Sequence, residues 1–293
     1  MKWKGRSGSD NIEDRRGGGS NFNPLRGGNR KFSFITIIII VVALYFGKDP
    51  MQFLQMGNEF LSTEQETTTT GVKNTGRSDD EMAHFVEVVL KDTEDVWTKV
   101  FREQLNSTYK KPILVMFSGH TTSACGAASA STGPFYCPVD EKVYIDLSFY
   151  NQLVNNLGGG GDFAMAYVIA HEVGHHVQKL LGISDKVHEL RRKISEEEYN
   201  ELSVRLELQA DFFAGVWAKE NQSMNHVLEE GDIEEAMNAA NAIGDDRLQK
   251  QAQGYAVPET FTHGTSQQRM KWFMKGFETG DMSNGDTFSA KDL

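Results

Sequence analysis

Three residues near the middle of the chain, His171, Glu172 and His175, have the types and spacing of a metal-binding catalytic motif. Residues four apart on a helix share a face, so both imidazoles can direct a nitrogen at one zinc ion. Glu172 lies about 100° around the helix from His171, where its carboxylate can reach a zinc-bound water without ligating the metal. The pattern predicts a site for one Zn²⁺ ion in a peptidase that uses Glu172 as its general base.

The residues around this motif favour a buried helix. The run 163–170 is apolar on all sides, which is typical of a helix inside a core. Two histidines and a glutamate on such a helix are costly unless a ligand satisfies them. Gly174 weakens a helix by about 1 kcal/mol relative to alanine, which suggests that another segment packs closely at this position.

A catalytic zinc ion usually has three protein ligands and an open position, so one further ligand is needed. Glu207 and Asp211 are again four residues apart, in a segment whose alanines and glycine allow a close helix contact. We expect Glu207 to bind the metal and Asp211 to accept a hydrogen bond from the second nitrogen of a ligand histidine. The reverse assignment, with Asp211 as the ligand, stays open.

Longer stretches of the sequence carry a resemblance to a known family. HEVGHH is followed, 32 residues after its second ligand histidine, by ELQAD, which resembles the gluzincin arrangement of HExxH and ExxxD. The chain more closely resembles the bacterial putative neutral zinc metallopeptidases, in MKWKGRSGSDNIEDRRG, a single apolar anchor, CGAASASTGPFYCPVDEKVYIDLSFY, HEVGHHVQ, ELQADFFAGVWA and HGTSQQRMKWF. The resemblance implies zinc on His171, His175 and Glu207, with Glu172 as the general base.

Two further residues are candidates for contact with the reacting peptide. His263 lies in a segment similar to one that opens a late helix in related membrane zinc peptidases, and it could stabilise the oxyanion. The alternative is a helix-start residue without a catalytic role. Tyr144 is a second candidate, in the alternating segment 142–147, which predicts a strand. We expect a substrate peptide to add to this strand.

The predicted elements give an α+β, zincin-like fold. Residues 112–117 form a second predicted strand, and capping-box spacing from Ser78 to Glu81 predicts the start of a helix. A short helix is expected near 148–156, and the chain from Phe163 onward has mostly helical patterning. We expect a small sheet packed on the active-site helix, a helix around 197–219 behind it, and a mostly helical C-terminal half.

The two cysteines, Cys125 and Cys137, are twelve positions apart in the loop before the strand at 142–147. An even pair in a loop fits a disulfide in an oxidising compartment. Two buried free thiols are the alternative. We expect the disulfide, since the rest of the sequence predicts an extracytoplasmic domain.

The beginning of the chain predicts a membrane anchor. Residues 1–31 carry a net charge of +5 without apolar periodicity, which indicates a disordered, basic, cytoplasmic tail. Residues 32–47 are uncharged, and as a helix they span roughly 24 Å, a shortfall from the ~30 Å hydrocarbon core that flanking lysines cover. A signal peptide is the rival, but the long charged lead favours an uncleaved anchor. Residues 48–77 are expected to be a polar linker.

Charge also bears on location and partners. The positive lead predicts a single-pass protein of the inner membrane, with the zinc metallopeptidase domain, residues 78–293, on the extracytoplasmic side. The rest of the chain carries −16, which argues against nucleic acid and leaves a peptide or protein as the expected substrate. The rival function is a non-catalytic, membrane-tethered scaffold or chaperone-like module stabilised by zinc. Glu172 favours the enzyme, because a structural site needs no base.

Overall fold

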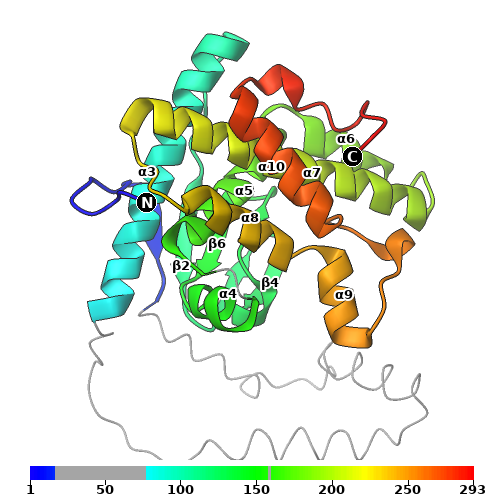
Figure 1. The fold of residues 1–293 in the computed structure, drawn as a ribbon, viewed down its shortest axis with the longest axis horizontal. Helices are drawn as coiled ribbons and strands as arrows, with labels where there is room; N and C mark the ends of the chain where they lie inside the picture. Colours follow the sequence, from blue (N-terminus) through cyan, green and yellow to red (C-terminus); the bar gives the residue numbers. More distant parts are fainter. Residues whose placement is uncertain (17–76, 158–159) are drawn as a thin grey trace, which may run out of the picture. The chain divides into compact units, whose positions relative to one another are not determined.

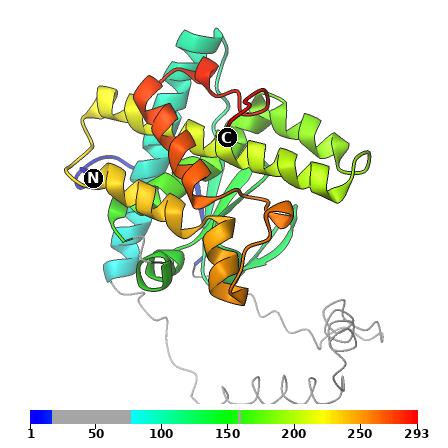
Figure 2. The same cartoon turned by 45° about the vertical axis from the view of Figure 1, so that its right-hand side comes forward.

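The computed structural model describes residues 1–16, 77–157 and 160–293 (Figures 1 and 2). Its elements in chain order are β1 (Ile12–Asp14), α3 (Arg77–Leu105), β2 (Ile113–Phe117), β3 (His120–Ser123), β4 (Gly126–Ser129), β5 (Phe135–Cys137), β6 (Lys142–Asp146), α4 (Phe149–Leu157), α5 (Asp162–Leu180), α6 (Ile183–Leu190), α7 (Glu196–Asn225), α8 (Asp232–Ala242), α9 (Asp245–Gln253) and α10 (Ser266–Thr279). A small sheet and a mostly helical C-terminal half confirm the α+β class.

The main sheet has the strand order β1-β2-β6-β5. β2 is parallel to β1 and to β6, while β5 runs antiparallel to β6 at the edge. Successive strand residues point to opposite faces, and the register sets Leu114 opposite Val143 and Met116 opposite Ile145. These four side chains are buried in the same core as residues of α3 and α5. One face of the sheet therefore supports α5, which carries the HExxH motif.

Tyr144 lies on the other face of the sheet, away from α5. It belongs to a separate buried cluster with Val115 and Phe117, and its hydroxyl donates a hydrogen bond to Asp140 at 2.7 Å. β6 is paired on both sides, with β2 and with β5, so it has no free edge for a substrate strand. The expectation that a peptide adds to residues 142–147 is therefore wrong, and the edge strand on this side is β5.

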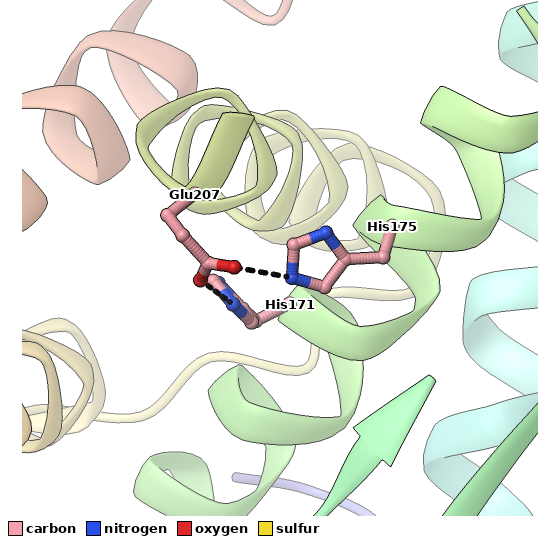
Figure 3. A group of neighbouring side chains, drawn as sticks. All are labelled: His171, His175 and Glu207. Atoms are coloured by element: carbon pink, nitrogen blue, oxygen red, sulfur yellow. Dashed lines mark hydrogen bonds and ion pairs between the residues drawn. The ribbon is translucent and has the colours of Figure 1, made fainter. Parts of the chain in front are cut away.

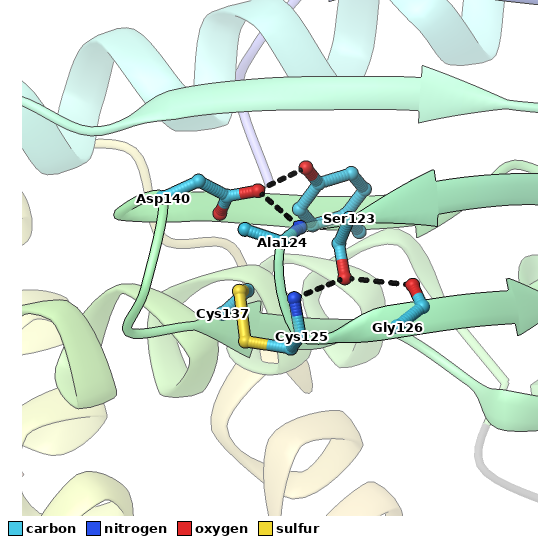
Figure 4. Close-up of a disulfide and its surroundings, with 7 residues drawn as sticks. Ser123, Ala124, Cys125, Gly126, Cys137 and Asp140 are labelled. Carbon is cyan, nitrogen blue, oxygen red and sulfur yellow. Dashed lines mark hydrogen bonds between the residues drawn. A yellow bond between two sulfur atoms is a disulfide. The ribbon is translucent and has the colours of Figure 1, made fainter.

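A disulfide fastens the β3–β4 hairpin to the edge of the main sheet (Figure 4). Cys125 lies in the turn of the hairpin and is bonded to Cys137 at the end of β5, with a Cα–Cα distance of 5.8 Å. The backbone N–H of Ala124 also donates to Asp140 at 3.0 Å. The hairpin is thus held to β5 by a covalent link and to the β5–β6 turn by a polar one.

The first residues of the chain fold with the main domain. β1 pairs in parallel with β2, and Trp3 is buried against Phe85 of α3, with ring centroids 5.3 Å apart. The predicted disorder is therefore wrong for residues 1–16, because contacts with distant segments stabilise a sequence that has little apolar patterning of its own. Figure 1 shows the start of the chain beside α3.

The remaining predictions for the N-terminal third lie outside the described residues. Residues 17–76 include the rest of the predicted tail, the anchor at 32–47 and nearly all of the linker at 48–77. Within the parts of the chain that the structure describes, no helix is long and apolar enough to cross a membrane.

Candidate metal centre

Two packed helices, α5 and α7, bring the predicted metal ligands together. α5 is buried along most of its length, and His171 and Glu172 are only 6% and 8% exposed. At Gly174 an added Cβ would lie 3.0 Å from the carbonyl oxygen of Ala210 on α7. The close contact expected at Gly174 is therefore confirmed. The missing side chain lets the two backbones approach, which places Glu207 of α7 beside the histidines of α5.

His171, His175 and Glu207 direct their donor atoms at one point (Figure 3). Nε2 of His171 lies 3.2 Å from one carboxylate oxygen of Glu207, and Nε2 of His175 lies 3.4 Å from the other. Bonds of about 2.0–2.1 Å to a tetrahedral zinc ion would separate such donor atoms by about 3.3 Å. The three side chains therefore fit zinc as they stand, in both donor type and spacing.

Asp211 is one helical turn beyond Glu207 and holds His171 from behind. Its Oδ1 accepts a hydrogen bond from Nδ1 of His171 at 2.8 Å and one from the hydroxyl of Tyr167 at 2.6 Å. Its Oδ2 accepts a hydrogen bond from Arg269 at 2.8 Å. Since Nδ1 of His171 donates its proton to Asp211, Nε2 is the nitrogen that remains for a metal, which would displace any proton shared there with Glu207. The structure thus brings Glu207, and not Asp211, to the converging Nε2 atoms.

The second histidine is held by an amide. Oε1 of Gln178 lies 2.9 Å from Nδ1 of His175, while the Gln178 amide nitrogen donates to the carbonyl of Leu206 at 2.6 Å and to Oε1 of Gln209 at 3.2 Å. Because the nitrogen is committed to two acceptors, the oxygen is the atom that faces His175. Nδ1 of His175 is therefore the protonated nitrogen, and its Nε2 is free to ligate.

A pocket of about 390 Å³ opens onto these side chains. Its wall includes residues 132–136, which lead into and form the edge strand β5, together with His263 from the segment before α10. Nδ1 of His263 lies 3.2 Å from Oδ1 of Asp245, the first residue of α9. The pocket thus joins the predicted ligands, Glu172 and His263 in one cavity, whereas Tyr144 is not among its lining residues.

Comparison with known proteins now identifies the relatives of this site. A family model described as putative neutral zinc metallopeptidase matches residues 1–288. The chain belongs to this family. It is 52% identical to the uncharacterized protein YpfJ of Escherichia coli K12 over 294 residues, which cover 98% of this chain and 99% of YpfJ. It is 46% identical to the uncharacterized protein Rv2575 of Mycobacterium tuberculosis H37Rv over 195 residues, 63% of this chain and 65% of that one. No solved structure matches significantly.

The electrostatics of the three predicted ligands can be compared with what a zinc metallopeptidase family implies. Burial would lower the pKa of His171, but the charge of Asp211 and hydrogen bonds to Asp211 and Glu207 raise it to about 10. Burial would raise the pKa of Glu207, but the two histidines hold it well below its ordinary value. Glu207 and Asp211 therefore stay ionised beside the buried histidines, and a divalent cation in the same place would replace the proton that His171 otherwise holds.

Glu172 has a different electrostatic environment. Burial raises its pKa above the ordinary value for a glutamate, and the charges of the two histidines only partly oppose this. A carboxyl group whose pKa is raised towards neutrality is a better proton acceptor for a reaction near pH 7. The position and environment of Glu172 thus match the role that the HExxH pattern predicts.

Sequence reasoning missed three residues that support the site. Tyr167 lies one turn before His171 on α5, so helical spacing could have indicated it. Gln178 lies three residues after His175, and the same rule applies. Arg269 is fully enclosed on α10, with its guanidinium on Asp211 and its Nη2 3.3 Å from the Tyr167 hydroxyl. Its partners are 58 and 102 positions away, so no local pattern pointed to it.

Proposed function

We propose that the protein is a zinc-dependent peptidase that hydrolyses peptide bonds, with Glu172 as the general base. The observation that carries the proposal is the convergence of His171, His175 and Glu207 beside Glu172, at the floor of an open pocket. Zinc bound there would lower the pKa of a bound water and polarise a peptide carbonyl. A purely structural site would need neither an adjacent buried base nor an opening to solvent.

Each protein group has a distinct role in this proposal. Glu172 takes a proton from the attacking water and passes it to the leaving amine. His263, held by Asp245, faces the same cavity and donates a hydrogen bond to the oxyanion. β5 is the edge strand of the main sheet in the described part of the chain, and an extended peptide can add along it as a further strand.

The decisive experiment compares the wild type with Glu172→Gln. Glutamine keeps the size of the side chain but cannot accept a proton at neutral pH, and general acid–base catalysis contributes about 10²–10⁴-fold. A peptide library is first screened for a substrate that the wild type cleaves. We expect Glu172→Gln to retain its zinc and thermal stability while hydrolysis falls at least about 100-fold. Glu201→Gln, an exposed change on α7, is the matched control and should cleave normally.

Two results would contradict the proposal. Wild-type hydrolysis by Glu172→Gln would remove Glu172 from the mechanism. Stoichiometric zinc without cleavage of any library peptide, together with full complementation of a deletion phenotype by Glu172→Gln, would favour the zinc-stabilised scaffold.

We further propose that residues 32–47 attach the protein to the inner membrane. The support is an uncharged, apolar run between Lys31 and Lys48 in an otherwise acidic protein. Alkaline extraction of membranes should leave the full chain in the pellet, and deletion of residues 32–47 should release it. Recovery of the full chain in the soluble fraction would contradict this anchor.

A further inference from the structure

Residues 1–16 are attached to the main domain along their whole length. At one end the indole N–H of Trp3 donates to Asp162 at 3.0 Å, where α5 begins, and the backbone N–H of Lys2 donates to the carbonyl of Val227 at 2.8 Å. At the other end β1 pairs with β2, and the backbone N–H of Arg15 donates to the carbonyl of Met116 at 2.8 Å. The segment thus touches both the start of the motif helix and the sheet that supports it.

Between these ends, Arg6 neutralises a buried acid of α3. Its guanidinium donates to both carboxylate oxygens of Asp92, at 2.6 and 2.5 Å. Asp92 is 1% exposed, and its other hydrogen-bond partner is the amide of Asn221 at 3.0 Å. A buried carboxylate that loses its cation is strongly destabilising. The positive charge that balances Asp92 of α3 therefore comes from a residue 86 positions earlier in the chain.

A second buried acid of α3 depends on the same segment. Glu94, also 1% exposed, accepts hydrogen bonds from the hydroxyl of Ser9 at 2.5 Å and from the amide of Asn11 at 2.7 Å. Lys111 is its third partner, at 3.0 Å. Removing the N-terminal segment would leave two buried acids of one helix without most of their partners. These contacts identify the segment as part of the core structure of the domain, not as an appendage.

We infer that residues 1–16 are an integral part of the native catalytic unit, so that Arg16 and Arg77 lie in the same compartment. If the chain between these two residues crosses a membrane, it must then cross back before it reaches Arg77. This replaces the arrangement expected from the charge pattern, with a cytoplasmic N-terminus and an extracytoplasmic domain on opposite sides of a single span. The inference does not depend on peptidase activity.

The first test measures the docking in the purified full chain. Arg6→Met leaves Asp92 buried without its cation and should lower the melting temperature by roughly 5–10 °C. Adding Asp92→Asn removes the unpaired charge and should recover much of that loss. Lys4→Met is the matched control, since Lys4 is 75% exposed and its ion pair with Glu81 is at the surface, so the melting temperature should change little. If Arg6→Met fails to fold while the double variant folds, the docking is supported. A melting temperature for Arg6→Met equal to that of Lys4→Met would overturn it.

The second test locates the two parts in intact membranes. Asp10→Cys and Glu201→Cys place single exposed thiols on the N-terminal segment and on α7. Spheroplasts that express each full-length variant are treated with a membrane-impermeant maleimide, before and after permeabilisation, with the parent chain as the baseline. No tag is fused to the N-terminus, because the Met1 amine lies 2.5 Å from Asp162 and a fusion would remove this contact.

The two labelling patterns decide the question. Both thiols reacting before permeabilisation, or both reacting only after it, supports the inference, whichever side they share. Reaction of Glu201→Cys before permeabilisation and of Asp10→Cys only after it would overturn the inference and restore the single-span arrangement.

Discussion

Oε1 of Gln178 accepts a hydrogen bond from Nδ1 of His175 at 2.9 Å and so fixes which nitrogen of that imidazole is free. Asp211 does the same for His171 at 2.8 Å. The two histidines predicted as ligands are thus held by groups of different charge, an amide on one side and a carboxylate on the other. Partners of this kind orient the ring and set its tautomer before a metal arrives.

Replacing Gln178 should therefore weaken metal binding. Gln178→Met keeps the approximate volume but removes the acceptor for Nδ1–H, so the ring can rotate or change its tautomer. We expect zinc affinity to fall about 10–100-fold, measured by competition with a chromophoric chelator on folded protein. Gln251→Met, an exposed change on α9, should have no effect. Equal affinity in the two variants would show that packing alone positions His175.

Glu207 and Asp211 should respond differently to substitution. Glu207→Ala removes a donor atom and should strip much of the zinc with little loss of stability. Asp211→Asn should weaken affinity about 10–100-fold and also destabilise the fold by about 3–5 kcal/mol, because Arg269 loses its buried counter-charge. Metal analysis and urea denaturation separate the two effects. Full zinc content in Glu207→Ala, with loss in Asp211→Asn, would reverse the assignment of ligand and support.

The contrast between these residues shows why part of the site could be predicted from the sequence. The two histidines, Glu207 and Asp211 follow the four-residue spacing of a helix, which a sequence displays directly. Arg269 reaches the same cluster from α10, and its role depends on how α10 packs against α7. Such a contact leaves no periodic signal, so only the folded chain reveals it.

The fold, too, could be predicted only in part from local sequence patterns. Alternation identified the strand at 142–147, but its central place depends on β5, which has three residues and gives no pattern of its own. Charge and the lack of apolar periodicity predicted disorder for residues 1–31, which include the ordered segment 1–16. Its order comes from Asp92 and Glu94, which are buried on α3 and more than 80 positions away. Long-range charge pairing was therefore the main feature that local patterns could not supply.

The disulfide should stabilise both the fold and the edge strand β5, which lines the pocket. Cys125 and Cys137 close a short loop that ends on β5, and a loop of this size contributes about 2–4 kcal/mol. The double change to alanine should lower the free energy of unfolding by that amount in urea denaturation. Because β5 lines the pocket, KM should rise more than kcat falls. A reducing agent should reproduce this loss in the wild type and leave the double variant unchanged. Equal stability of oxidised and reduced wild type would contradict the prediction.

Asp245 should control the charge of His263. The hydrogen bond from His263 to Asp245 raises the pKa of the imidazole above its ordinary value, despite partial burial. The pKa of Asp245 is lowered, because hydrogen bonds from His263 outweigh its burial. A raised histidine pKa stabilises the fold below about pH 6.5, and that contribution is lost as the pH rises through the folded value. A lowered aspartate pKa contributes above about pH 3.9. The pair should therefore stabilise the protein most between these limits.

NMR titration of the metal-free protein tests whether Asp245 raises the pKa of His263. Asp245→Asn should move the pKa of His263 down towards about 6.5, the ordinary value for histidine. Stability measured across pH 4–9 should differ most between wild type and Asp245→Asn near pH 5–6, and the difference should shrink as the pH rises. An unchanged His263 titration in Asp245→Asn would show that the contact does not persist in solution.

Kinetics of His263 variants then test the proposed oxyanion contact. A donor that acts only in the transition state lowers kcat when it is removed and leaves KM nearly unchanged. His263→Phe keeps a ring at the pocket wall but has no N–H, and kcat for the library substrate should fall by roughly 10²–10³-fold. His263→Gln retains a side-chain donor and should recover part of that loss. If His263 merely holds the segment before α10, both variants should lose thermal stability together and show equal kcat. That outcome would remove His263 from the catalytic machinery while leaving the roles of Glu172 and the zinc ligands untouched.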